Sequence, residues 1–479
     1  MIFLDQYIFH LLVLSPVSAA IFITLIPTID TASKLSISRF FSLTGLAIYL
    51  RLLFLFTNKK IALKTAASLT IINFNINFTL TLNQYNVFLY GAAAILLVIN
   101  TISHETNDLK TNMHQAIPFV LVFILYIIFG QTDLRVALPI LSIGNFLVYF
   151  LIAETNKVRR GSTIFQMGIF LFSCDALALV LLQIPFDTHS SFVPVLFQFA
   201  LLIPGLSRLC LPMVSPFMRK LFLNVDDSEG PFILLFLNLS GFFILLLVYQ
   251  DLNTLSPLLS ILTASIIGLG SVFTVLLAIN EQQTRTIPFH CLIFYSSLAS
   301  MILFLSRDGD LIFFSISIIL VNMICFFYFA RTALRVRQKL GQAFYYPQLR
   351  STLFLMASLF IGIPGLGIGT PLLAAWYRIL ELKLHSHENS YSIFWQILFI
   401  IFALNILLLS YALIKNLRNE ENYWGSSWSW SQTNPTLIDR SFVITPWLIA
   451  LISLLLSAAV FYSSVKLNDS LISTEVAND

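Results

Sequence analysis

The sequence predicts an all-α protein that crosses a membrane many times. Of its 479 residues, 58% are apolar or aromatic and only 10% are Asp, Glu, Lys or Arg, whereas soluble domains carry about 25% charged residues. The mean hydropathy is +0.87. The apolar residues fall in blocks of about 20, the length that a helix needs to cross about 30 Å of hydrocarbon. These observations exclude a water-soluble globular domain.

About fourteen blocks have this length. The expected spans are 8–29, 39–57, 79–100, 115–131, 134–153, 162–184, 192–213, 231–250, 255–279, 287–305, 311–330, 351–377, 392–414 and 441–465. The first span has no basic region before it and no small-residue cleavage site after it, so we expect a retained helix and not a signal peptide. The third is the least regular, because Asn77–Asn86 is polar and alternating and either begins the span or lies outside the hydrocarbon.

The loop charges predict the orientation of the spans. Loops after odd-numbered spans hold roughly 17 Lys and Arg, and the other loops with the tail hold roughly 8. The basic segments Lys157–Arg160 and Arg331–Lys339 both belong to the richer face, which we expect to be cytoplasmic. We therefore expect a multi-pass protein of a bacterial-type inner membrane with both termini outside. Membrane lipid is an expected partner, whereas the net charge of +4 requires no nucleic acid.

Proline and glycine interrupt two of the spans in a related way. The seventh contains Pro204 and Pro212, and the twelfth contains Gly362 and Pro364. Proline removes a backbone donor and clashes with the preceding turn, so both helices should kink or unwind. Breaks at matching positions of two halves are typical of an inverted-repeat transporter. The alternative is that Gly and Pro are simply common in membrane helices.

Four local strings carry a family resemblance. They are "NEQQTRTIPFHCLIFYSSLASMILFL" (Asn280–Leu305), "LFLMASLFIGIPGLGIGTPLLAAW" (Leu353–Trp376), "SCDALALVLL" (Ser173–Leu182) and "LPMVSPFMRKLF" (Leu211–Phe222). In their order and spacing they resemble segments of the antiporter-like subunits shared by respiratory complex I (NADH:quinone oxidoreductase) and the Mrp cation antiporters. The resemblance covers much of residues 80–410.

This resemblance implies two inverted five-helix repeats with flanking helices. The corresponding division is 1–114 for the N-terminal helices, 115–250 and 251–414 for the two repeats, and 415–479 for a loop and the last helix. It implies a subunit of a multi-subunit complex that translocates protons or cations, with other protein subunits as partners. Two alternatives stay open: the membrane subunit of a DAB-type inorganic-carbon accumulation complex, and a subunit that serves only in assembly.

The chain departs from the resemblance along the buried polar axis. Proton-pumping members carry a glutamate on the fifth helix, lysines on the seventh and near the eighth, and a lysine or glutamate on the twelfth. Here the fifth, eighth and eleventh spans offer Asn145, Asn238 and Asn322, and no ionisable side chain lies between Ser351 and Tyr377. Asparagine cannot lose and regain a proton at physiological pH, so we expect a degenerate proton path.

Few ionisable residues remain inside the spans. Asp175 and Arg208 occupy successive spans, and each charge at mid-bilayer costs about 2.5–3.5 kcal/mol or more, so we expect them to pair. The pair is either a remnant of an ion path or an inert contact between helices. His290, near Arg285, is either a proton acceptor at a channel mouth or a hydrogen-bonded interfacial residue.

Catalytic chemistry has no visible basis in this sequence. The cysteines lie inside apolar blocks without the spacing of a metal site or a disulfide framework; they are Cys174, Cys210, Cys291 and Cys325. No glycine-rich nucleotide loop, haem-ligand pair or zinc pattern stands out. We expect no cofactor, no metal and no catalytic residue, so that any driving reaction belongs to a partner.

Overall fold

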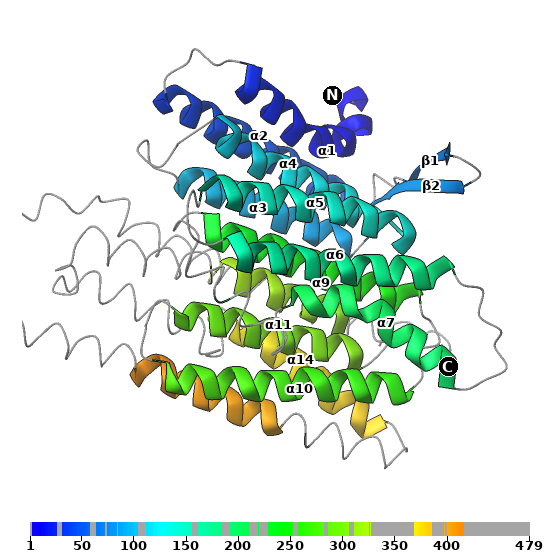
Figure 1. Cartoon of the computed structure of the whole chain (residues 1–479), viewed down its shortest axis with the longest axis vertical. Coiled ribbons are helices and arrows are strands. Elements are labelled where there is room, and N and C mark those ends of the chain that lie inside the picture. The colour runs from blue at the N-terminus through cyan, green and yellow to red at the C-terminus, as the bar shows by residue number, and fades with distance from the viewer. Residues whose placement is uncertain are drawn as a thin grey trace, which may run out of the picture. The chain divides into compact units, whose positions relative to one another are not determined.

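The computed structural model divides into two compact units, Met1–Leu259 and Ser260–Asp479. Figure 1 shows its helices, and the described residues are 2–25, 31–57, 64–71, 74–83, 85–103, 112–155, 161–183, 192–209, 219, 229–251, 257–281, 286–305, 311–324, 326, 368–385, 397 and 400–415.

Helices account for nearly all of the described residues. Those of the first unit are α1 (Ile2–Leu25), α2 (Thr31–Thr57), α3 (Asn86–Ser103), α4 (Asn112–Phe129), α5 (Leu134–Thr155), α6 (Gly161–Gln183), α7 (Phe192–Arg208) and α9 (Glu229–Asp251). They are followed by α10 (Pro257–Asn280), α11 (Ile287–Leu305), Leu311–Ile324, α14 (Gly369–His385) and Ile400–Lys415. Among the described helices, 7 are long and apolar enough to cross a membrane, which confirms the predicted class of a helical multi-span protein. The expected span at 441–465 lies outside the described residues.

Helix α9 forms the centre of the first unit. It packs against α7 and also contacts α3, α4 and α5, while α1 packs against α2 and α4. In its apolar window Gly230–Tyr249, 94% of the residues are buried. Helices of the first unit therefore surround the apolar helix α9. A polar group that faces α9 is shielded from both lipid and water.

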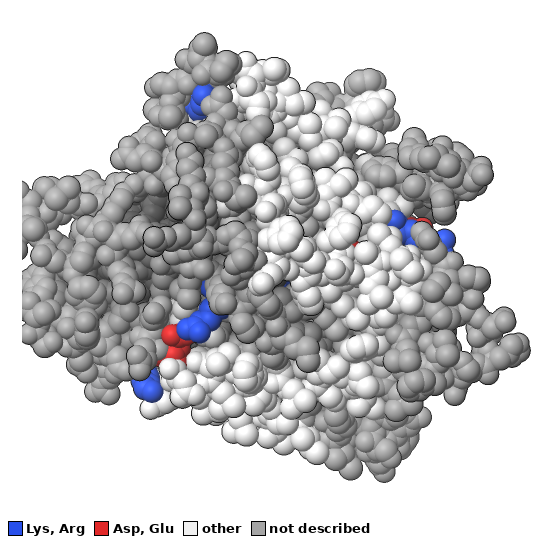
Figure 2. Space-filling view, viewed as in Figure 1, with Lys and Arg blue, Asp and Glu red and all other residues white. Residues whose placement is uncertain are grey.

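The outer surface is as apolar as the interior, as expected for a surface in contact with lipid. Phe40, Phe146 and Phe172 are 66%, 66% and 60% exposed, which would be costly in water. In Figure 2 the described residues of the visible face are almost all uncharged. The exposure of these aromatic side chains therefore agrees with a protein that lies in a membrane.

A β-hairpin before α3 corrects the predicted third span. Strands β1 (Lys64–Ile71) and β2 (Phe74–Thr81) pair antiparallel, with Ile71 opposite Phe74. The helix begins at Asn86 and not at residue 79. Two asparagines fix this start, because Asn83 Oδ1 accepts the Asn86 amide at 2.7 Å and Asn86 Oδ1 accepts the Asn83 amide at 2.7 Å. This reciprocal arrangement is a capping box, which satisfies backbone donors at a helix N-terminus.

The structure describes one of the four residues assigned to broken helices, Pro204 of α7. The helix continues through Pro204 and ends at Arg208, so Pro204 does not by itself interrupt it. The other three residues assigned to broken helices, Pro212, Gly362 and Pro364, lie outside the described residues.

The second unit contains a helix that is buried along its whole length. In α11 the apolar window Ile287–Phe304 is 100% buried. Three buried serines on this helix, Ser296, Ser297 and Ser300, donate hydrogen bonds to carbonyls one turn earlier. These bonds satisfy the hydroxyls locally, which is how serine is accommodated in an apolar helix.

Candidate ion-path site

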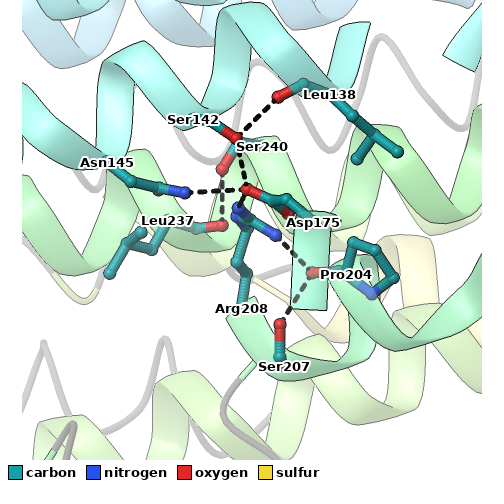
Figure 3. Close-up of polar contacts among 9 residues, drawn as sticks. All are labelled: Leu138, Ser142, Asn145, Asp175, Pro204, Ser207, Arg208, Leu237 and Ser240. Carbon is teal, nitrogen blue, oxygen red and sulfur yellow. Dashed lines mark hydrogen bonds and ion pairs between the residues drawn. The ribbon is translucent and has the colours of Figure 1, made fainter. Parts of the chain in front are cut away.

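An ion pair lies in the interior of the first unit. The Arg208 NH2 group, in the last turn of α7, donates to Asp175 Oδ2 of α6 at 2.6 Å (Figure 3). The side chains are 0% and 1% exposed. The two charges that the sequence places on successive spans are therefore in direct contact, and each offsets part of the desolvation cost of the other.

Two side chains of α5 complete the shell of the carboxylate. Asn145 Nδ2 donates to Asp175 Oδ2 at 3.1 Å, and the Ser142 hydroxyl lies 3.0 Å from the same oxygen. Residues three apart share one face of a helix, so α5 presents both groups to α6. The Ser142 hydroxyl also lies 3.1 Å from the Leu138 carbonyl oxygen, and its one proton can be donated to either acceptor.

Glycine allows the helix that carries Arg208 to approach α9 closely. A Cβ atom added to Gly241 would lie 2.7 Å from Arg208 Cβ and 2.9 Å from the Gly205 carbonyl oxygen. Arg208 NH1 donates to the Pro204 carbonyl at 2.7 Å, and that carbonyl also accepts the Ser207 hydroxyl at 2.9 Å. Backbone contact and a second hydrogen bond therefore hold the guanidinium in place beside Asp175.

The two carboxylate oxygens of Asp175 have different surroundings. Oδ2 is within hydrogen-bond distance of three donor groups, whereas Oδ1 is buried and accepts no hydrogen bond from the described residues. The pair carries no net charge while Asp175 is ionised. An arginine keeps its proton at any physiological pH, so Asp175 is the member of the pair that can exchange one.

The structure also describes the other predicted residues Asn238, His290 and Asn322. Asn238 is buried on α9, with 3% of its surface exposed. In the second unit, His290 is 1% exposed, and its Nε2 atom lies 3.6 Å from Glu281 Oε2. Asn322 donates to the Leu292 carbonyl at 3.1 Å. Arg285, expected near His290, lies outside the described residues.

Sequence reasoning missed two contributors, Ser142 and Glu281. A serine in a membrane helix carries no distinctive signal, although Ser142 lies one helical turn before Asn145 and therefore on the same face. Glu281 directly follows the end of α10, where a charged residue is unremarkable. Within the described ranges, no three His, Cys, Asp or Glu side chains are close enough to hold a metal ion.

Comparisons with known proteins identify the fold. No family model matches the sequence, and no curated protein matches it either. Solved structures do match, and three of them are described next.

A chain of respiratory complex I from Thermus thermophilus, solved with bound NADH, is similar with a TM-score of 0.71 and 11% identity, covering 94% of this chain and 98% of that one. A chain of the Mrp complex from Dietzia sp. DQ12-45-1b has a TM-score of 0.72 and 10% identity over 96% of each chain. A chain of the membrane-bound sulfane sulfur reductase, an archaeal respiratory membrane complex, has a TM-score of 0.71 and 14% identity, covering 95% of this chain and 76% of that one.

These likenesses agree with the resemblance drawn from the four local strings. TM-scores of 0.71 to 0.72 establish the fold. Identities of 10–14% are too low to transfer an activity, which must be argued from the residues. The chain therefore has the fold of the membrane subunits found in respiratory complex I and the Mrp complex.

Proposed function

We propose that this chain is the membrane subunit of a multi-subunit complex that translocates protons or other cations, and that Asp175 and Arg208 belong to its ion path. The buried pair of Asp175 and Arg208, with Asn145 and Ser142 around it, is the observation that carries this proposal. The structural neighbours add support, since they are chains of multi-subunit membrane complexes. The division into repeats 115–250 and 251–414 is part of the same proposal, and it assigns all four side chains to the first repeat.

The chemistry of the pair suggests how it acts on a proton. Protonation of Asp175 at Oδ1 removes the negative charge that compensates the buried guanidinium of Arg208. A buried guanidinium without a counter-charge is unfavourable by several kcal/mol, so the two sites are coupled. In the proposed path, a proton on Asp175 and the position of the Arg208 guanidinium therefore depend on each other.

The asparagines assigned to the polar axis limit the role of this chain. Asn238 and Asn322 can orient water but cannot carry a proton. We therefore assign proton binding in the first repeat to Asp175 and assign the driving reaction to a partner subunit. The replacement of ionisable residues by asparagine agrees with the degenerate path that the sequence suggests.

The test is proton flux in the purified complex. The complex, isolated in mild detergent and reconstituted into liposomes, should dissipate an imposed pH gradient, and Asp175→Asn should abolish this flux when it is normalised to the amount of complex. Asp133→Asn is the matched control, because Asp133 Oδ1 accepts the Arg135 amide at 2.8 Å at the start of α5 and asparagine is an equally good cap. A wild-type complex without flux, or an Asp175→Asn complex with normal flux, would refute the proposal.

The partner that co-purifies separates this function from its alternatives. A quinone-reductase or antiporter partner supports the proposed function. A large zinc-containing protein as the partner would instead support the inorganic-carbon accumulation complex. A normally assembled complex in which the charges of Asp175 and Arg208 have no effect on activity would support the assembly subunit.

A further inference from the structure

A polar cavity lies at one end of the first unit, away from the ion pair. Its volume is about 130 Å³, and its lining residues come from the start of α3, the end of α4 and the last third of α9. The buried members used below are Asn86, Phe129, Gln131, Phe243 and Leu247. We call this space the amide cavity. None of the lining residues that the structure describes is charged.

Hydrogen bonds make the wall of the amide cavity rigid. The Asn86 side-chain amide donates to the Thr81 carbonyl at 2.7 Å and to the Phe129 carbonyl at 3.0 Å. Its oxygen closes the capping box with Asn83. One side chain therefore ties the end of β2, the start of α3 and the end of α4 together, and this frame holds the cavity open.

Two buried polar atoms near the cavity have no hydrogen-bond partner among the described residues. Gln131 donates its side-chain amide to the Ile127 carbonyl at 3.0 Å, but its Oε1 atom accepts nothing. The Tyr90 hydroxyl is likewise buried and unpaired, and it lies 2.9 Å from the position of a Cβ atom on Gly130, the residue before Gln131. The first atom is an acceptor and the second can donate. An unsatisfied buried polar group costs about 1–3 kcal/mol, so each of these atoms calls for a partner.

Water in the cavity can supply the partner of Gln131 Oε1, because Gln131 lines the cavity. A water molecule donates and accepts, and it is stable in a cavity that offers it two or more polar contacts. A volume of about 130 Å³ is enough for several waters. The uncharged lining does not suit a bare cation or an anion, which require opposite charge or several converging dipoles. At the rim, Thr132 is exposed and Tyr85 is half-buried, so the cavity faces the aqueous end of the helices.

The inner end of the amide cavity is apolar. Phe243 of α9 packs on Phe129 of α4 with ring centroids 5.2 Å apart, and both line the cavity. Ser240 lies one helical turn before Phe243 on the same face of α9, and Figure 3 shows it in the group of side chains around Asp175 and Arg208. Along α9, Phe243 therefore lies between the cavity residues Leu246 and Leu247 and the level of the ion pair. A small apolar constriction of this kind excludes water and stops conduction until it opens.

We propose that the amide cavity is a water-binding vestibule of the ion path, and that the Phe129–Phe243 pair is the apolar barrier between its water and Asp175–Arg208. The assignment of an ion path rests on the proposed function. The water site and the barrier rest on the cavity, the unpaired oxygen of its lining residue Gln131, and the aromatic contact.

The test measures access of water directly, in the intact complex and without a pH gradient. Hydroxyl-radical footprinting of the wild-type complex should oxidise Phe243 about tenfold faster than Phe236, because radicals form from water bound nearby. Both rings lie on α9 and are 4% and 0% exposed, so neither should react in a dry interior. Gln131→Leu, which removes the unpaired acceptor, should reduce the oxidation of Phe243.

Silver ions, which are about the size of water, test the barrier. In a background without native cysteine, Leu247→Cys should react with silver while the equally buried Leu245→Cys, which packs on Gly205, should not. Ser240→Cys should be unreactive behind Phe243 and become reactive when Phe243→Ala is added.

Equal reaction at positions 247 and 245, together with equal oxidation of the two phenylalanines, would overturn the vestibule. Reactivity of Ser240→Cys with Phe243 intact would overturn the barrier. A reactive vestibule in a complex without proton flux would refute the proposed function and leave the water site standing. Normal proton flux in a complex whose cavity is unreactive would refute the water site and leave the proposed function standing.

Discussion

Removal of one charge from the buried pair should destabilise the protein far more than removal of both. In Asp175→Asn, the guanidinium of Arg208 keeps its bond to the Pro204 carbonyl but loses the charge of the carboxylate at 2.6 Å. Breaking a buried ion pair on one side typically costs about 3–5 kcal/mol. Since 1.4 kcal/mol is a factor of ten in an equilibrium constant, the ratio of folded to unfolded protein should fall by about a hundredfold or more.

The double variant Asp175→Asn with Arg208→Gln removes the uncompensated charge. A glutamine at 208 can still donate to the Pro204 carbonyl, and an asparagine at 175 can still bond to Asn145. The remaining cost is that of weakened neutral hydrogen bonds, about 1–2 kcal/mol. The two substitutions should therefore be non-additive by several kcal/mol in a double-mutant cycle.

Thermal unfolding of the detergent-solubilised complex and its abundance in membranes measure this cycle. Additive losses, with the double variant as unstable as the sum of the single variants, would refute the ion pair as a coupled unit. Flux per complex then separates the two interpretations of the pair. The proposed function requires low flux in the recovered double variant, whereas an inert structural pair predicts normal flux.

Three further predictions follow from the packing, the cap and the loop charges. Gly241→Ala should destabilise the complex by about 1–3 kcal/mol through overpacking against Arg208 and Gly205, while Gly45→Ala, whose added Cβ would meet Ser15 Oγ at 3.6 Å, should be neutral in the same melting assay. Asn86→Leu removes the bonds that join β2, α3 and α4 and should increase proteolysis of the hairpin; unchanged cleavage would contradict that role. Cysteines introduced into Arg331–Arg350 should react only from the cytoplasmic side, and reaction from the outside would reverse the predicted orientation.

The membrane explains why helix positions could be predicted so closely. Hydrocarbon thickness fixes the length of a span, so an apolar block marks the helix directly. The expected 287–305 agrees with Ile287–Leu305, and 134–153 is close to Leu134–Thr155. The hairpin was not predicted, because its apolar residues repeat every second position and not at the helical period. Apolar Phe74, Ile76 and Phe78 alternate with polar residues, which is typical of a strand, and a hydropathy average over a helical window removes that alternation.

The site could be predicted in part, for a related reason. A charge in an apolar block is rare and costly, so Asp175 and Arg208 were identifiable without a structure. Their neighbour Ser142 was not, because a neutral serine is inexpensive in a membrane helix and common there. Its role depends on which helices pack together, and a single sequence does not carry that information.

Under the proposed function, Asp175 of α6 supplies the carboxylate that the resemblance places on the fifth helix. The resemblance places a glutamate near Asn145 on the fifth helix, and here the Asn145 amide lies 3.1 Å from a carboxylate supplied by α6. Arg208 stands on the seventh helix, where the resemblance places a lysine.

If the carboxylate matters by its location and not by its helix, Asn145→Asp should compensate for Asp175→Asn. The exchanged variant should regain stability, because the new carboxylate again lies beside the guanidinium, and it should regain part of the flux. An exchanged variant at wild-type abundance that is as inactive as Asp175→Asn would show that the helix, and not the charge at that place, determines the path.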